Sequence, residues 1–264
     1  MAFVEQRLIW EGRINRADLV AQFGISPNQA TADLRRFDVL HPQALVYDPR
    51  AKTYRAGAGL RAADDRDTGD LLRELRLIAE GVMAAGDGTL VAPPPLALAE
   101  APMRRVEAAT LRLVLGAIRD GRALETTYRS FSSNEPRRRR LAPHALVFDG
   151  FRWHVRARDL DEDRFKDFVI GRMSEAVVGA TVAAEVDRDT EWSRKLTLTI
   201  APHPELGPAG RQAIEMDYGM TDGQLRLECR AAVLWYVRRR LGLIPGHEKM
   251  AGHDQHIVLV SIDG

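Results

Sequence analysis

The sequence NRADLVAQFGISPNQATADLRRFDVL, residues 15–40, predicts two short helices joined by a tight turn. Asn15 is a favourable N-cap for the first helix, and the aspartate three positions later makes an imperfect capping pair with it. Gly24 can adopt the left-handed conformation that ends a helix. Ser26 opens a Ser-x-x-Gln capping box, and the proline that follows it suits the first helical position. We therefore expect a second helix over residues 27–38.

Two short helices around a glycine-containing turn form a helix-turn-helix, in which the second helix reads DNA. At 100° per residue, Ala30, Leu34 and Phe37 fall on one face of that helix, and we expect them to lie in the core. The opposite face carries Asn, Gln, Thr and Arg side chains. Such side chains hydrogen-bond to base edges and bind phosphates, so this face is a candidate DNA-reading surface.

The flanking segments complete a larger motif. Residues 3–11 predict a preceding helix, and residues 44–47 and 53–55 predict two short strands. The turn between these strands, residues 48–52, carries two cations at its tip, which is typical of a wing. The whole segment resembles bacterial winged helix-turn-helix domains. The alternative is a helical subdomain with no role in DNA binding. The residues that we expect to contact DNA are Ser26, Asn28, Gln29, Thr31, Arg35, Arg36, Arg50 and Lys52.

Residues 59–110 predict a helical linker between two folded parts. Residues 57–70 are small and polar. Amphipathic spacing predicts helices over residues 71–83, over residues 96–103 and from near Val106 to Gly121, with a loop over residues 84–95. These helices can dimerise or merely connect, and the sequence leaves both possibilities open.

From Leu124 onward the pattern changes to short strands. Residues 124–130 alternate and are rich in Thr and Tyr, and a basic turn at residues 137–140 follows them. Asp149-Gly150 between two apolar strands predicts a hairpin with a two-residue turn. A further strand is predicted over residues 164–173.

The order of these features resembles the WYL domain, an Sm-like β-barrel of bacterial transcription regulators. The resemblance covers about residues 111–180: a helix, a Tyr-x-Ser strand, a basic turn, a Pro-x-x-Leu-Val strand, a Gly-x-x-Trp strand and a final Arg. The triplet that names the family is Trp153-His154-Val155 here, so two of its three residues depart from the family pattern. The three-part layout is similar to that of WYL repressors that accompany phage-defence systems such as BREX and CBASS.

The resemblance implies that the barrel senses a ligand, of the class of nucleotides, single strands or nucleic-acid ends. The arginine-rich composition of this segment also suits a phosphate-containing ligand, because guanidinium groups bind phosphate oxygens with two hydrogen bonds. The alternative is a solvated face whose arginines pair with Asp159, Asp161 and Asp163. Trp153 is expected to be a structural residue of the strand core. The candidate ligand-binding residues are Tyr128, Ser130, Arg139, Arg140, His154, Arg156, Arg158, Arg164 and Arg172.

The C-terminal part predicts a small α+β domain. Residues 195–200, 225–230 and 257–260 have the pattern of strands, and residues 203–214 and 233–241 have the pattern of helices. This order resembles the C-terminal extension of WYL regulators, which implies a role in dimer contacts. The run Arg238-Arg239-Arg240 ends the last helix, where cations favour the helix dipole, and a role in nucleic-acid binding is the alternative.

Composition and charge exclude several classes of protein. Of 264 residues, 45% are hydrophobic, which suffices for a core, and no apolar run is long enough to span a membrane. The net charge is +1, but residues 111–172 hold 14 basic and 9 acidic residues, whereas residues 1–58 hold 8 and 6. The strongest anion site is therefore expected in the barrel. A single cysteine, Cys229, excludes a disulfide framework and a cysteine-rich metal site.

The sequence carries no recognisable catalytic motif. His253 and His256 lack the flanking ligands of a metal site, and no nucleophile elbow or phosphate loop is present. We expect a cytoplasmic protein with no cofactor and no metal.

The predicted fold class is α+β multidomain: a winged helix-turn-helix (1–58), a helical linker (59–110), a WYL-like β-barrel (111–185) and a C-terminal α+β extension (190–264). The predicted function is a dimeric repressor that binds an inverted-repeat operator of double-stranded DNA and is released by an anionic nucleotide or nucleic-acid ligand. A non-catalytic nucleic-acid-binding adaptor and a transcriptional activator are the alternatives.

Overall fold

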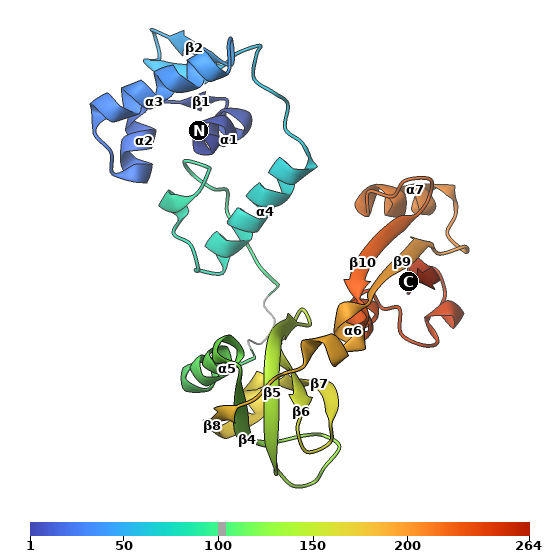
Figure 1. Ribbon diagram of the computed structural model, residues 1–264. Helices are drawn as coiled ribbons and strands as arrows, with labels where there is room; N and C mark the ends of the chain where they lie inside the picture. The colour runs from blue at the N-terminus through green and yellow to red at the C-terminus, as the bar shows by residue number, and fades with distance from the viewer. Residues whose placement is uncertain (100–103) are drawn as a thin grey trace. The chain divides into compact units, whose positions relative to one another are not determined.

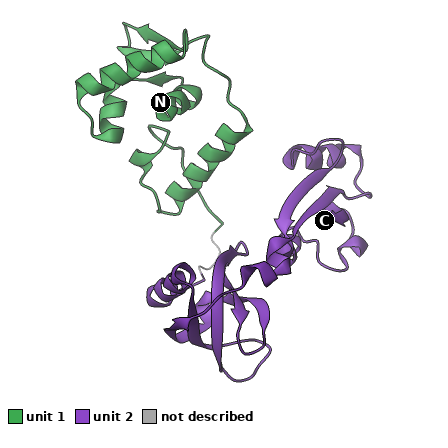
Figure 2. Ribbon diagram, in the orientation of Figure 1, with its two compact units in different colours: residues 1–101 green, residues 102–264 purple. Residues whose placement is uncertain are grey.

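The computed structural model describes residues 1–99 and 104–264 (Figure 1). The chain divides into two compact units, residues 1–101 and 102–264 (Figure 2). Among the described residues, no helix is long and apolar enough to cross a membrane.

Unit 1 begins with a winged helix-turn-helix. Its elements are α1 (Ala2–Glu11), β1 (Arg13–Ile14), α2 (Arg16–Phe23), α3 (Pro27–Leu40), β2 (Leu45–Asp48) and β3 (Thr53–Ala56), and the three strands pair in the order β1-β3-β2. The Asn15 side chain accepts hydrogen bonds from two backbone N–H groups of α2, and the capping box is complete. Gly24 ends α2 with a φ of 62°, as the turn requires. The predicted helices and wing are therefore confirmed, and β1 is an additional strand.

The core of this domain contains the apolar face that the sequence predicts. Ala30, Leu34 and Phe37 are each at most 1% exposed, and they pack with residues of α1 and α2. Phe23, at the end of α2, is 54% exposed and makes an edge-on contact with the Phe3 ring, with 5.3 Å between the ring centroids. The buried face of α3 packs on the rest of unit 1, and the opposite face of the helix is exposed.

The linker helix α4 (Asp65–Ala79) belongs to unit 1. It begins and ends earlier than the predicted range of 71–83. It begins at Asp65 because Asp64 caps it in a reciprocal capping box with Asp67. Asp67 also accepts hydrogen bonds from Gln6 of α1 and from Arg61, which joins α4 to the winged domain. A short 3₁₀ helix, η1 (Ala85–Asp87), follows. The helix predicted over residues 96–103 is wrong for 96–99, which have no regular structure, and its remainder lies outside the described residues.

Unit 2 begins with the barrel domain. Helix α5 (Ala108–Asp120) leads into β4 (Arg122–Tyr128), β5 (Arg137–Phe148), β6 (Trp153–Asp159), β7 (Arg164–Val169), η2 (Ile170–Arg172) and β8 (Met173–Thr181). All neighbouring strands are antiparallel, in the order β7-β6-β5-β4-β8. Val114 and Ala117 of α5 are fully buried against the sheet, together with residues such as Leu124 and Leu141.

The turn between β5 and β6 differs from the prediction. The strands end at Phe148 and start again at Trp153, so four residues separate them rather than two. The Asp149 carboxylate accepts hydrogen bonds from the backbone N–H groups of Phe151 and Arg152, and this stabilises the wider turn. Trp153 was expected in the strand core, but it is 46% exposed and packs on Phe148 at the surface.

The C-terminal domain follows a short connection that contains η3 (Val186–Arg188) and α6 (Thr190–Ser193). Its elements are β9 (Lys195–Pro202), α7 (Pro208–Asp217), β10 (Leu225–Arg230), η4 (Ala231–Val233), α8 (Leu234–Arg240), η5 (His247–Lys249) and β11 (Ile257–Asp263). The strands form an antiparallel sheet in the order β10-β9-β11. Ile200, Leu243 and Ile257 form its core with Ile214 of α7, as the predicted strand and helix pattern requires.

Candidate nucleic-acid interface and barrel arginines

The open face of α3 carries three polar side chains without partners. Asn28, Arg35 and Arg36 are exposed, and within residues 1–99 and 104–264 their side chains make no hydrogen bond or ion pair. They lie opposite the buried face of α3, as predicted. Because their donors are not committed to other protein groups, these side chains can bind base edges and phosphates.

The other predicted residues of this helix have local partners. The Ser26 hydroxyl accepts a hydrogen bond from the backbone N–H of Gln29, and the Gln29 amide donates to Asp33 rather than completing the capping box. The Thr31 hydroxyl donates to the Pro27 carbonyl. These groups therefore shape the start of α3, and contact with DNA through Gln29 requires that it release Asp33.

The wing presents the remaining two predicted cations. Arg50 and Lys52 are exposed in the turn between β2 and β3. Asp48 holds this turn, because it accepts hydrogen bonds from the backbone N–H groups of Arg50 and Ala51 and pairs with Arg55 at 2.8 Å. The Ala51 N–H and the Arg55 guanidinium lower the pKa of Asp48, so its charge persists. Arg55 is an exposed wing cation that the sequence analysis missed, although its place in a strand next to the wing was a usable signal.

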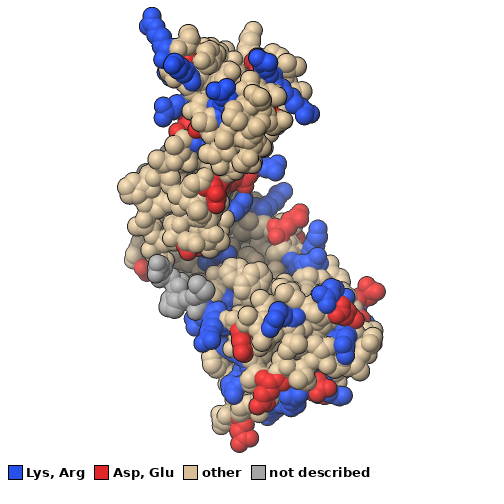
Figure 3. Space-filling model, turned by 90° about the vertical axis from the view of Figure 1, so that its left-hand side faces the viewer, with Lys and Arg blue, Asp and Glu red and all other residues tan. Residues whose placement is uncertain are grey.

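The two units differ in how their charges are distributed. In Figure 3, basic side chains project from the upper end of unit 1, where Figure 1 places α3 and β2. Over unit 2, basic and acidic side chains alternate on the face shown. A basic stretch of sequence in the barrel is therefore not the same as a basic surface.

The structure places the nine candidate ligand-binding residues of the barrel in three groups. The first group lies at the ends of β4 and η2. Tyr128 is buried in the core, where its hydroxyl accepts a hydrogen bond from the Val169 N–H, so it does not offer a stacking surface. Arg172 lies over the exposed Phe131 ring at 3.9 Å from the centroid. The Ser130 hydroxyl shares a hydrogen bond with that of Ser132.

The second group, His154 and Arg156, faces the connection to the C-terminal domain. Arg156 is 3% exposed and donates to both carboxylate oxygens of Asp189 at 2.8 Å. It also contacts Glu191 at 2.9 Å and Asp167 at 3.4 Å. Burial alone would lower the pKa of Arg156, but these carboxylates raise it above the ordinary value. Arg156 is thus a buried structural cation and does not line an open anion pocket.

Two buried histidines accompany this network. His144 lies 3.1 Å from Asp189, and His154 stacks on Tyr236 of α8 with 5.1 Å between the ring centroids. Burial lowers the pKa of both imidazoles, although nearby carboxylates oppose the shift. The Tyr236 hydroxyl donates to Asp167, whose own pKa burial raises. The network therefore joins the barrel to the C-terminal domain through neutral rings and paired charges.

The third group lies around the β6–β7 turn and contains Arg139, Arg140, Arg158 and Arg164, of which the first three are paired with carboxylates. Arg139 contacts Asp159 at 2.9 Å and Glu162 at 2.5 Å. Arg140 pairs with Asp161, and Arg158 pairs with Asp163 and Glu185. Lys166 and Arg139 lower the pKa of Glu162 to about 2. Arg164 is exposed and has no ion pair among the described residues.

The nine residues therefore do not converge on one pocket. Asp159, Asp161 and Asp163 do pair with the arginines, as the alternative proposed, but Asp159 is fully buried and not solvated. The partner that sequence reasoning missed is Asp189, which lies 33 positions after Arg156 in the interdomain connection. No local spacing could have indicated this pair.

The remaining candidates for chemistry are isolated. Within the described parts of the chain, no group of three or more His, Cys, Asp or Glu side chains could hold a metal ion. Cys229 is half-buried in β10, and burial raises the pKa of its thiol, which disfavours the reactive thiolate.

Family models match three consecutive parts of the chain. The winged helix-turn-helix domain of the BrxR transcriptional regulator matches residues 1–67, the WYL domain matches residues 109–178, and the C-terminal dimerization domain of the BrxR transcriptional regulator matches residues 195–263. These matches contain the elements of the winged domain, the barrel and the C-terminal domain described above.

Curated relatives match along most of their length. The chain is 38% identical over 264 residues to the DNA-binding transcriptional repressor CapW of Stenotrophomonas maltophilia, with 97% of this chain and 87% of the relative covered. It is 36% identical to CapW of Pseudomonas aeruginosa, with 92% and 82% covered, and 31% identical to CapW of Escherichia coli, with 100% and 88% covered.

Among solved structures, Proteasome accessory factor B/C (PafBC) of Arthrobacter aurescens aligns at 16% identity and a TM-score of 0.33, over 98% of this chain and 44% of that chain. This likeness is too weak to support an argument. The identity to the CapW repressors and the three domains matched in order decide the matter: the chain belongs to the family of BrxR- and CapW-type WYL-domain transcriptional regulators.

Proposed function

We propose that the chain is a non-catalytic, cytoplasmic repressor that binds an inverted-repeat operator as a homodimer. The observation that carries this proposal is the open face of α3, where Asn28, Arg35 and Arg36 have no partner in the described part of the chain, beside a wing whose exposed cations include Arg50 and Lys52. The relatives are named DNA-binding transcriptional repressors, which supports the sign of regulation.

The reading mode follows from the side chains. Arginine pairs with two acceptors of guanine, and asparagine pairs with adenine, when a helix lies in the major groove. Arg50 and Lys52 of the wing suit phosphates or the minor groove. Because a two-fold dimer presents two copies of α3 in opposite directions, its operator is an inverted repeat. The match of residues 195–263 to a dimerization domain supports the dimer.

We also propose that an anionic ligand at the WYL domain relieves repression and that the target is a phage-defence operon. The resemblance to defence-associated regulators supports the setting. Of the nine candidate residues in the barrel, Arg164 and Arg172 have no carboxylate partner in the described part of the chain. Ser130 lies between two residues that contact Arg172: the Arg129 backbone N–H donates to the Arg172 carbonyl, and the Arg172 guanidinium lies over the Phe131 ring. These three are the residues that remain suited to an anion.

The test is a gel shift with DNA from upstream of the operon that encodes the chain, at several salt concentrations. The wild-type chain should retard this DNA, and the Arg35→Ala, Arg36→Ala double variant should weaken binding by about tenfold or more, because each arginine that reads a base edge contributes about 1–3 kcal/mol.

The matched control is Arg66→Ala, Arg73→Ala. It removes the same charge from exposed positions of α4 in the same unit, so it should bind as the wild type does. If both double variants lose the same affinity for the DNA, the effect comes from net charge and not from contacts of α3. A wild-type chain that shows no sequence preference at physiological salt would favour the adaptor alternative instead.

A further inference from the structure

A groove lies within unit 2 between the β5–β6 turn of the barrel and α8 of the C-terminal domain. It consists of two adjoining pockets, of about 100 and about 270 Å³, which share Asp149, Tyr236 and Arg240 in their linings. None of the nine barrel residues discussed above lines either pocket. The groove is therefore a separate feature that requires its own explanation.

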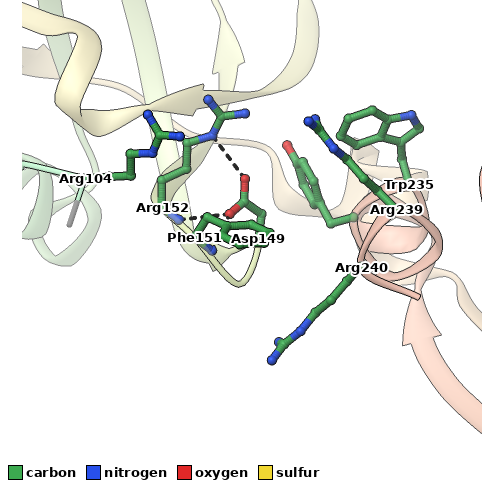
Figure 4. Close-up of a pocket in the computed structure, with 8 residues that line it drawn as sticks. Arg104, Asp149, Phe151, Arg152, Trp235, Arg239 and Arg240 are labelled. Atoms are coloured by element: carbon green, nitrogen blue, oxygen red, sulfur yellow. Dashed lines mark hydrogen bonds and ion pairs between the residues drawn. The ribbon is translucent and has the colours of Figure 1, made fainter. Parts of the chain in front are cut away.

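The smaller pocket is strongly cationic. Its lining contains Arg104, Arg152, Arg239 and Arg240, but only one carboxylate, Asp149. Figure 4 shows Arg104 and Arg152 on the barrel side and Arg239 and Arg240 on α8.

The single carboxylate of this pocket is already committed. Asp149 accepts from the Arg152 guanidinium at 3.1 Å and from two backbone N–H groups. Within residues 104–264, Arg239 and Arg240 have no carboxylate partner. The pocket therefore holds a positive charge that the protein does not neutralise.

The turn is built to let one of these cations approach. Gly150 has a φ of 96°, and a Cβ atom there would lie 3.3 Å from the Cδ atom of Arg240. The absence of a side chain at position 150 thus allows the Arg240 stem to pack on the turn. The guanidinium is held at the rim of the groove, where a fork of N–H donors suits phosphate oxygens.

The larger pocket and the rim supply surface for a flat apolar group. Leu146 and Val147 of β5 face Val233 and Val237 across the larger pocket. Two aromatic rings at the smaller pocket are largely open, Phe151 at 62% and Trp235 at 54% exposed. Arg239 lies over the Trp235 ring at 5.0 Å from the centroid. Exposed rings beside free guanidinium groups are the surface on which nucleobases stack.

We propose that this groove binds a nucleoside 5′-phosphate, either as a free nucleotide or as the 5′ end of a nucleic-acid strand. The phosphate binds at the arginines of the smaller pocket, where Figure 4 shows the guanidinium groups of Arg152 and Arg239 on one side of the turn and that of Arg240 on the other. The base lies against Trp235 or enters the larger pocket. The combination of unneutralised arginines, open aromatic rings and an adjoining apolar pocket favours this chemistry over a simple inorganic anion, which would leave the apolar part unused.

The position of the groove gives it a regulatory meaning, which rests on the proposed function. One wall is the barrel and the other is α8 of the domain that matches the dimerization model. Tyr236 already fixes α8 to the barrel through His154 and Asp167. A ligand that contacts both walls changes the balance between arrangements of the two domains if it binds one arrangement more tightly. Occupancy of the groove then alters the dimer that presents the two reading helices.

The test measures binding by calorimetry with the full-length chain and three probes: adenosine 5′-monophosphate, a 5′-phosphorylated DNA tetranucleotide and the same tetranucleotide with a 5′-hydroxyl. At least one phosphorylated probe should bind, and the 5′-hydroxyl strand should bind more weakly. Tighter binding of the monophosphate identifies a free nucleotide as the ligand, and tighter binding of the phosphorylated strand identifies the 5′ end of a nucleic acid. Arg239→Ala and Arg240→Ala should each weaken binding by about tenfold, and Trp235→Leu should weaken it with the arginines intact.

The matched control is Arg211→Ala, Arg226→Ala, which removes two exposed arginines of the same domain outside the groove. It should bind the probes as the wild type does. The proposal is overturned if no phosphorylated probe binds up to about 1 mM, if the groove variants bind normally, or if the control loses as much affinity.

Operator binding is measured separately in the same variants without probe. The groove variants should retard operator DNA as the wild type does. If the wild-type chain does not bind operator DNA, the proposed function is wrong. The calorimetric result on probe binding is independent of that outcome and still tests the groove.

Discussion

Arg156 illustrates how a residue that looks like a ligand-binding cation can be a structural one. It lies in β6 with three carboxylates around it, two of which come from the connection before β9. A buried guanidinium is tolerated only when paired, because its desolvation costs several kcal/mol. The pairing therefore orders the connection between the barrel and the C-terminal domain.

We predict that Asp189→Ala destabilises unit 2 by about 3 kcal/mol, because it leaves Arg156 buried with less compensation. This loss of stability is near the lower end of the values that follow removal of one partner from a buried ion pair, because Asp167 and Glu191 still contact Arg156. The measurement is urea unfolding followed by tryptophan fluorescence in a Trp10→Phe background, where the remaining tryptophans all lie in unit 2.

The control for this prediction is Asp161→Ala, which breaks the exposed pair with Arg140. An exposed pair contributes about 0–1 kcal/mol, so this variant should unfold close to the wild type. If both variants lose the same stability, burial does not distinguish the two pairs and the structural role of Arg156 is wrong.

The sequence could identify the arginines of the barrel but not their partners. Asp159, Asp161 and Asp163 were available as partners because they lie at the end of β6 and in the adjacent turn, and they do pair. Asp189 is brought to Arg156 only by the course of the chain after β8. Net charge by segment therefore overestimated the free charge of the barrel, since it counts residues and not pairs.

At the scale of elements, the α2–turn–α3 unit was predictable because each of its signals is local. Asn15, Gly24 and Ser26 cap or end helices through hydrogen bonds within four residues of chain. The β5–β6 turn was less predictable. Asp149-Gly150 indicates a turn, but the Asp149 carboxylate bonds to Phe151 and Arg152 and widens it to four residues.

We predict different effects for two asparagines of this unit, Asn15 at the N-cap of α2 and Asn28 in the first turn of α3. Asn15→Ala removes the N-cap of α2, so it should lower the free energy of unfolding of unit 1 by about 1 kcal/mol. Asn28→Ala removes a side chain with no partner in the described structure, so stability should not change while operator affinity falls. Thermal unfolding and gel shifts on both variants separate the two effects. A stability loss in Asn28→Ala would indicate that this residue supports α3 and does not read DNA.

Helix α8 shows the limit of element-level prediction. Its basic C-terminal end, Arg238-Arg239-Arg240, was interpreted as a helix end that favours the dipole. The structure separates the three: Arg238 donates to the Leu243 carbonyl, whereas Arg239 and Arg240 line the groove. Only the packing of α8 on the barrel, through Tyr236, makes that distinction visible.

At the scale of the whole molecule, the linker region divides differently from its sequence pattern. Residues 59–99 lie in unit 1, where Asp67 joins α4 to α1 and the Arg7 guanidinium donates to the Gly88 carbonyl. Each reading head is therefore a larger body than the winged domain alone. Two such bodies on one dimer must both reach the operator.

We predict that the spacing of the half-sites is fixed by the dimer. After footprinting defines the operator, an insertion of about 5 base pairs between half-sites rotates one of them by half a turn of DNA. Both heads can then no longer bind at once, and apparent affinity should fall by about 100-fold, to that of a probe with a single half-site. Gel shifts on the native, inserted and single half-site probes make the comparison. Equal affinity for the native and inserted operators would mean that each head binds independently. A ligand that changes the dimer interface would then not change the affinity for DNA.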